Sequence, residues 1–343
     1  MSALAELPLI ETVEGCDPQH IPAHVFESEV PLVLKGLVSE WPAVKACSRS
    51  LAHATEYLSE YWVDKPVTIY VGDSDINGRF AYNDDFTDFN FKSGYGQLAQ
   101  VLQKLSEEPD DDRAQAIYVG STAVDGWLPG FREQNDVVVP SDDVTVSFWL
   151  GNRTHVSTHF DFPDNIACVV AGRRRFTLYP PEQIGNLYIG PLDHTPAGQA
   201  ISLVDTSNPD FERFPKFREA LDSAHSYELE PGDAIFIPGM WWHQVQSLSA
   251  FNLLVNYWWC PTPAVMGSPM DAMTHAILSI RELPQRYRDA WKRLFDHYVF
   301  SADESVYAHI PENGRGCLAP LDKKAAAKLR SRIVERLKPR KPG

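Results

Sequence analysis

The sequence contains few cysteines, and they form no recognisable motif. Five of the 343 residues are cysteine, they are scattered along the chain, and none stands in a Cys-x-x-Cys pair. This pattern excludes a disulfide framework and gives no sign of a structural zinc site. Because reduced thiols are typical of cytoplasmic proteins, we expect a cytoplasmic location.

Long apolar runs and positive charge are scarce as well. No stretch of about 18 apolar residues occurs, and residues 1–13 lack a basic segment followed by an apolar one, so we expect neither a membrane span nor a signal peptide. The 31 Lys and Arg residues against 46 Asp and Glu residues give a net charge of −15. Such a chain repels polyanions, which disfavours bulk nucleic-acid binding.

The composition is that of a folded protein, with 44% apolar and 11% aromatic residues, and the pattern changes twice along the chain. Residues 1–140 mix predicted strands with a predicted helix and form an expected α/β scaffold that packs on the core. Residues 141–262 alternate β-rich runs with Gly, Pro and Asn, which is typical of a sandwich or barrel of short strands. Residues 263–343 have helical periodicity. The expected class is therefore mainly β with added helices. Strands are predicted at 31–34, 67–71, 116–119, 144–150, 166–171, 173–179 and 234–237, and helices at 96–105, 270–281, 287–299 and 321–337.

The chemistry is concentrated in the triplet His159-Phe160-Asp161 and in His243, which follows the segment Pro238-Gly239-Met240-Trp241-Trp242. In a strand, residues i and i+2 point to the same side, so His159 and Asp161 can share one metal ion. Two imidazoles and one carboxylate on one side of a metal leave the opposite positions open, which is the arrangement of non-haem Fe(II) oxygenases. We therefore predict His159, Asp161 and His243 as the metal ligands and as the catalytic centre.

Residues 149–161, Asn165 and residues 172–181 resemble the cupin-like branch of the JmjC oxygenases, a group that includes the asparaginyl hydroxylase of hypoxia-inducible factor. The likeness extends to residues 231–233, 238–243 and 255–258, and it covers most of residues 25–262. The resemblance implies a double-stranded β-helix, or jelly roll, that binds Fe(II) and 2-oxoglutarate and uses O2 to hydroxylate an unactivated C–H bond. It also implies that the helices at 263–343 form a homodimer contact.

The co-substrate makes a separate demand on the sequence, because the distal carboxylate of 2-oxoglutarate needs a buried cation. Alternation along 173–179 places Arg174 on the same face as Phe176 and Leu178, so Arg174 is the predicted partner. In the resembling enzymes this position is usually Lys, but Arg can hold a carboxylate with two hydrogen bonds.

Further co-substrate contacts are predicted from single positions. Tyr118 resembles a tyrosine that helps to hold the distal carboxylate, Trp258 resembles an aromatic wall residue, and Asn165 and Asn256 match family positions near the co-substrate. Amides on apolar strands must find hydrogen bonds, which also favours a pocket role for the two asparagines. Thr158 is included because it precedes His159, whereas His155 is expected in a loop.

The sequence leaves the substrate open. The resemblance favours a protein side chain, and hydroxylation of a small molecule or an RNA base by the same mechanism is the alternative. A metal-binding cupin that works without 2-oxoglutarate and a binding module that has lost activity are two further interpretations. The basic segment near the end of the chain, which includes Lys323, Arg330 and Arg340, is expected to form a solvated helix face or to contact an acidic surface.

Overall fold

A computed structural model describes residues 7–111, 113–260, 262–263 and 265–338 of the chain. The contacts divide it into two compact units, Met1–Pro261 and Thr262–Gly343.

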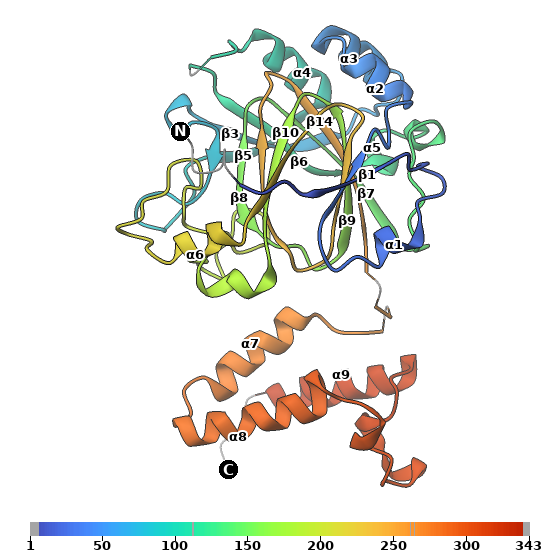
Figure 1. Ribbon diagram of the computed structural model, residues 1–343, viewed down its shortest axis with the longest axis vertical. Coiled ribbons are helices and arrows are strands. Elements are labelled where there is room, and N and C mark those ends of the chain that lie inside the picture. Colours follow the sequence, from blue (N-terminus) through green and yellow to red (C-terminus); the bar gives the residue numbers. More distant parts are fainter. Residues whose placement is uncertain (1–6, 112, 261, 264, 339–343) are drawn as a thin grey trace. The chain divides into compact units, whose positions relative to one another are not determined.

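The first unit is built on a nine-stranded sheet that is shared by residues from most of its length (Figure 1). The central strands β7, β9 and β14 belong to the predicted β-rich region, and strands from residues 1–140 extend the same sheet on both sides. The strand order is β1 (Glu11–Glu14), β2 (Leu32–Lys35), β12 (Ala234–Ile237), β9 (Asp164–Ala171), β14 (Asn252–Trp259), β7 (Val144–Gly151), β6 (Ala116–Ala123), β3 (Pro66–Gly72) and β5 (Lys92–Gln97).

A second sheet of five strands faces the first. Its order is β11 (His225–Leu229), β10 (Arg174–Tyr179), β13 (Trp242–Ser247), β8 (His155–His159) and β4 (Arg79–Phe80). Side chains of both sheets pack in one buried cluster, which contains Ala167 and Val169 of β9 together with Phe176 and Leu178 of β10. Two facing sheets with added helices confirm the predicted jelly-roll class.

Alternation along the strands separates this inner layer from an outer one. Ile166, Cys168 and Val170 of β9 point away from the small sheet and pack with the helices in the largest buried cluster. The helices of the first unit are α1 (Ala23–Phe26), α2 (Pro42–Cys47), α3 (Leu51–Ser59), α4 (Leu98–Glu107), α5 (Val124–Trp127) and α6 (Phe217–Asp222), with short 3₁₀ turns at Ser74–Ile76, Phe131–Glu133 and Pro181–Gly185. One face of the large sheet is thereby buried under helices, and the other is free to line a cavity.

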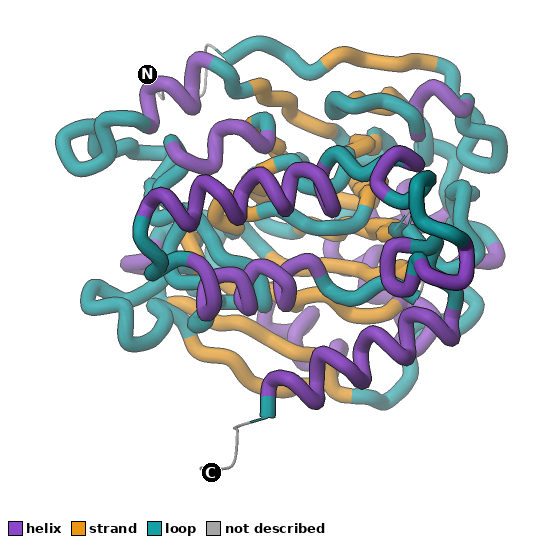
Figure 2. Tube along the Cα trace, turned by 90° about the horizontal axis from the view of Figure 1, so that it is seen from below, coloured by secondary structure: helices purple, strands orange, loops and turns teal. Residues whose placement is uncertain are grey.

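The second unit is helical, as its periodicity predicts. It contains α7 (Pro269–Ile280), α8 (Gln285–Phe295) and α9 (Lys323–Leu337), which Figure 2 shows as purple segments, together with a π-helical turn (Asp296–Phe300) and 3₁₀ turns at Glu304–Val306, Glu312–Gly314 and Gly316–Leu318. No residue of α7 or α8 is buried. Arg340, which belongs to the predicted basic segment, lies outside the described residues.

The structure corrects the local predictions at three places. The helix predicted at 96–105 begins only at Leu98, because the Gln97 side chain caps the helix and residues up to Gln97 form β5. The helix predicted at 287–299 runs from Gln285 to Phe295 and then widens into the π-helical turn. His155, expected in a loop, is buried and begins β8, because it pairs with Arg79 of the distant strand β4.

All five cysteines are free. Among the described residues, none of the helices combines the length and the apolar character that crossing a bilayer requires.

Candidate metal and co-substrate site

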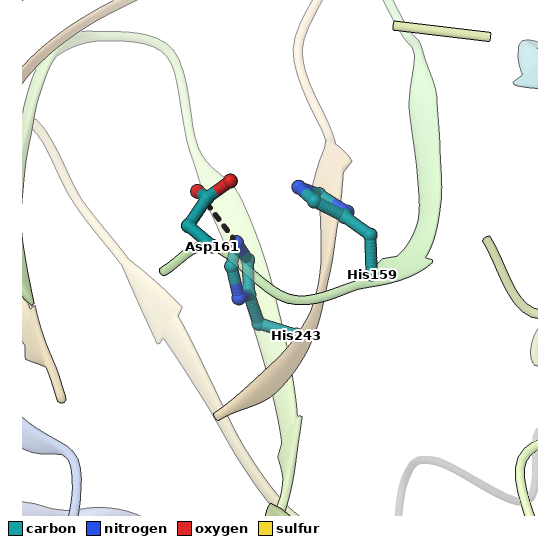
Figure 3. Close-up of side chains that lie close together, drawn as sticks. All are labelled: His159, Asp161 and His243. Carbon is teal, nitrogen blue, oxygen red and sulfur yellow. Dashed lines mark ion pairs between the residues drawn. The ribbon is translucent and has the colours of Figure 1, made fainter. Parts of the chain in front are cut away.

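The three predicted ligands converge between the two sheets, where Figure 3 shows their side chains facing one another. Ligand atoms of His159, Asp161 and His243 all lie within 4.8 Å of one another. His159 ends β8, and its Cα is directly paired with that of His243 in the neighbouring antiparallel strand β13. Asp161 lies two residues beyond the end of β8, because the strand stops at His159. The side chains of His159 and Asp161 nevertheless point to the same side, as predicted.

Both imidazoles are fixed by hydrogen bonds to the backbone. Nδ1 of His159 donates to the carbonyl of Ser157 at 2.9 Å, and Nδ1 of His243 donates to the carbonyl of Trp241 at 3.0 Å. Since a carbonyl can only accept, Nδ1 carries the proton in the neutral form of each ring, and Nε2 is then the nitrogen that can bind a metal ion. Nε2 of His243 lies 3.7 Å from the carboxylate of Asp161.

The environment of His243 also keeps its ring neutral. Burial, together with the nearby ring of His159, lowers the pKa of His243 to about 4. A neutral imidazole at physiological pH offers its lone pair without first having to lose a proton.

The two ligand segments are held together by a tight loop. The backbone N–H of Gly239 donates to the Asp164 carboxylate at 2.8 Å, and that of Met240 donates to the carbonyl of Asp161 at 2.7 Å. A Cβ on Gly239 would come within 2.5 Å of the carbonyl oxygen of Phe162, so only glycine allows this approach. The loop before β13 therefore fixes the position of Asp161.

A cavity of about 470 Å³ opens beside the three ligands and reaches Arg174. Arg174 is 1% exposed, and its Nε and Nη2 atoms have no hydrogen-bond partner among the described residues. Burial lowers the pKa of Arg174 to about 10, and the interaction with Tyr118 opposes this shift. The guanidinium is still protonated at pH 7, which leaves a buried positive charge without an acidic partner among the described residues.

Most of the other predicted contacts also line this cavity, namely Tyr118, Asn165, Asn256 and Trp258. The indole N–H of Trp149 donates to Asn256 at 2.7 Å, and the Asn256 amide donates to Asn165 at 3.3 Å. The amides are thus held in place from within the fold. Burial raises the pKa of Tyr118, whose hydroxyl therefore stays protonated.

Thr158 is the predicted contact that the structure does not bring into the cavity. Its side chain is 1% exposed and is not among the lining residues, whereas its neighbours Ser157 and His159 line the cavity. Alternation along β8 turns Thr158 to the opposite face, so the structure does not bring its side chain together with the other predicted contacts.

Sequence reasoning missed an aromatic wall of the cavity. The wall consists of Phe91, Phe80, Tyr118, Trp149 and Trp258, whose successive ring centroids are 5.1, 5.9, 5.8 and 5.7 Å apart. Trp258 was predicted as an aromatic wall residue and Tyr118 as a contact of the distal carboxylate, but the continuous wall was not predicted. The remaining three come from separate strands and a turn, and no local pattern joins them.

These observations fit the implied cofactors. Two neutral imidazoles and a carboxylate form the donor set that a ferrous ion takes in non-haem oxygenases. The orphaned donors of Arg174 form a fork suited to a carboxylate. The arrangement offers three ligands for a metal ion beside a cavity with room for an organic acid.

Comparison with known proteins agrees with the fold described above. The profile of the Cupin-like domain family matches residues 18–264, so the chain belongs to this JmjC-like family. It is 26% identical over 333 residues to "tRNA wybutosine-synthesizing protein 5" of Gallus gallus, covering 89% of this chain and 97% of that protein. It is 28% identical over 287 residues to "Lysine-specific demethylase JMJ31" of Arabidopsis thaliana and 26% identical over 251 residues to "Lysine-specific demethylase 8" of Xenopus tropicalis. These alignments cover 74% and 70% of this chain and half of each demethylase.

Proposed function

We propose that the protein is an Fe(II)- and 2-oxoglutarate-dependent oxygenase that hydroxylates an unactivated C–H bond of a protein side chain. The observation that carries this proposal is one cavity with His159, Asp161 and His243 beside it and Arg174 within it. The Nε and Nη2 atoms of Arg174 have no partner among the residues that the structure describes. A bound ferrous ion would supply the reaction of O2 with 2-oxoglutarate and the substrate C–H group, which yields succinate, CO2 and the alcohol.

The residues of the chain have distinct tasks in this proposal. His159 and His243 hold the metal through Nε2, because their Nδ1 atoms are tied to the backbone. Asp161 supplies a negative charge. Arg174 and the Tyr118 hydroxyl hold the distal carboxylate of 2-oxoglutarate, and the carboxylate in turn neutralises the buried guanidinium. The aromatic wall keeps water away from the reacting groups.

The first test detects the complex of Fe(II) with 2-oxoglutarate in the protein. Anaerobic addition of Fe(II) and then 2-oxoglutarate to the wild-type protein is expected to produce a weak visible charge-transfer band. A metal-binding cupin that works without 2-oxoglutarate would bind iron and show no band, and a binding module without activity would bind neither.

The second test is turnover. Wild-type protein with Fe(II), 2-oxoglutarate and O2 is expected to form succinate slowly without substrate, and Asp161→Ala is expected to abolish this reaction. Undiminished succinate formation by Asp161→Ala would rule out the proposed metal site.

RNA-base hydroxylation is the second candidate. The similarity to the wybutosine-synthesizing protein favours it, because that similarity extends over 97% of the relative and 89% of this chain. The net charge of −15 opposes it, and we therefore keep the protein side chain as the first choice.

A further inference from the structure

We propose that the substrate is an extended peptide that adds a strand to the free edge of the large sheet at β5 and inserts a neutral side chain into the cavity. The inference rests on the oxygenase function proposed above and specifies its substrate and its docking surface. Strand addition to an exposed sheet edge is a common mode of peptide recognition.

The outer edge of β5 is available for pairing. β5 is the last strand of the large sheet and pairs with β3 on one side only, as far as the described residues go. The backbone N–H of Gln97 donates to its own capping partner Gln100 at 3.4 Å and so faces away from β3. Because backbone groups alternate in direction along a strand, the N–H and C=O groups of Ser93 and Tyr95 face outward as well.

This edge is continuous with the mouth of the cavity. Thr68 and Tyr70 of β3 line the cavity, and they pair with Tyr95 and Ser93 of β5. Residues paired across an antiparallel ladder point to the same face, so Tyr95 and Ser93 lie on the cavity side of the sheet. The Tyr95 side chain is 82% exposed there. A strand added beside β5 would direct alternate side chains toward the cavity mouth.

Gly94 leaves the middle of β5 without a side chain. A Cβ at Gly94 would meet no heavy atom within 4 Å, so the fold itself does not require glycine there. Glycine inside a strand reduces stability, and it is typical of places where another backbone comes close.

The cavity selects a neutral side chain. Apart from the two histidines, the charged residues among its described lining are Asp161 and Arg174, which the proposed function assigns to the metal and to 2-oxoglutarate. What remains for the substrate is the aromatic wall and neutral polar groups such as Thr68, Ser121 and Gln199. A buried cationic or anionic side chain would find no partner among these groups.

An acidic rim next to β5 favours basic residues on either side of the inserted side chain. The rim consists of Asp84, Asp85 and Asp88, which are exposed in the turn before β5, and of exposed Asp193. Asp193 precedes His194, whose ring stacks on Phe89 at 4.5 Å, so the two segments lie together. The rim repels the phosphates of RNA and attracts Lys and Arg of a peptide.

The test uses two pools of short blocked peptides that contain every neutral amino acid at the centre, flanked by alanine and lysine in one pool and by alanine and glutamate in the other. Succinate formation is measured with each pool and expressed relative to the same variant's rate without peptide. The lysine pool is expected to stimulate wild-type protein and to slow amide hydrogen exchange at residues 92–97, whereas the glutamate pool and unfractionated tRNA are expected to do neither.

Two variants examine the edge directly. Ser93→Pro removes an outward N–H, and Tyr95→Ala removes the exposed ring; each is expected to raise the half-stimulating concentration of the lysine pool roughly tenfold. Glu11→Pro, at the start of the opposite edge strand β1, serves as the matched control and should keep the wild-type value. Thermal unfolding verifies that each variant is folded.

The outcomes separate the two proposals. Succinate formation without peptide, combined with stimulation that neither β5 variant weakens, overturns the docking surface alone. Stimulation by tRNA in place of the lysine pool overturns the peptide inference and leaves the oxygenase intact. Absence of any 2-oxoglutarate turnover or iron chelate band overturns the proposed function and the inference together.

Discussion

Replacing Arg174 with Met should stabilise the protein in the absence of 2-oxoglutarate and abolish its response to that acid. Burial lowers the pKa of Arg174 from the ordinary value of an arginine to about 10, and each pKa unit corresponds to about 1.4 kcal/mol. The folded state therefore disfavours the charged guanidinium by about 3 kcal/mol at neutral pH, where the side chain remains protonated. Methionine fills a similar volume without a charge, and we expect a gain of about 1–3 kcal/mol in the free energy of unfolding.

The stabilisation by 2-oxoglutarate, in contrast, should be lost in Arg174→Met. In wild-type protein, 2-oxoglutarate at about 100 times its dissociation constant adds about 2.7 kcal/mol of stability, because it binds only the folded state. Arg174→Met loses the carboxylate partner and should gain nothing. Urea unfolding with and without 2-oxoglutarate measures both effects, with Mn²⁺ in place of iron to prevent turnover.

Arg173 provides the matched control, because it is the neighbouring arginine and lies at the surface. Its side chain is 49% exposed and makes an ion pair of 3.3 Å with Glu228. Arg173→Met should change the stability by less than about 0.5 kcal/mol and keep the full response to 2-oxoglutarate. The reasoning fails if Arg174→Met is less stable than wild type without ligand, or if 2-oxoglutarate still stabilises it.

Three further predictions concern other parts of the chain. Burial lowers the pKa of His155 to about 4, so the folded state favours the neutral ring. The stability that is present above pH 6.5 should therefore be lost as the pH falls toward 4, with a total loss of about 3 kcal/mol when the ring is fully protonated. Urea unfolding of His155→Asn should show a flatter dependence of stability on pH. Gly239→Ala brings a Cβ within 2.5 Å of the Phe162 carbonyl and should weaken Co²⁺ binding and cost about 1–3 kcal/mol, whereas Gly185→Ala, which has open space, should leave Co²⁺ titrations unchanged. The exposed apolar side chains of the second unit lead us to expect a homodimer, and light scattering should detect dissociation in Trp291→Glu; a wild-type monomer at every concentration would contradict it.

The convergence of His159, Asp161 and His243 could be predicted because its signals are local. Residues two apart in an extended chain point to the same side, and His159 and Asp161 keep this relation although β8 ends at His159. The same alternation placed Arg174 on the inner face of β10, where it lines the cavity. The strand that carries His243 could be located from the turns that flank it. What these residues bind remains a prediction.

Features that depend on distant pairing could not be predicted. β4 has only two residues, and its parallel pairing with β8 turns His155 from an expected loop residue into a buried strand residue. β5 is rich in glycine and exposed, so it carries no hydrophobic alternation. Trp149 lies in a correctly predicted strand, but that strand is buried on both faces, and the pattern therefore does not say which side faces the cavity.

A comparison with Arg79, another arginine of the small sheet, explains why Arg174 is the candidate partner of the distal carboxylate. Arg79 donates to the carbonyl of Leu203 at 3.2 Å, and the carboxylate of Asp205 favours its charged form. Arg174 has only the Tyr118 hydroxyl, and both its Nε and Nη2 remain unpaired among the described residues. The Nε of Arg79 is also unpaired among the described residues, but the fold supplies this arginine with a carbonyl and a nearby carboxylate. Arg174 has no such acid, and we therefore expect an acid from outside to complete its site.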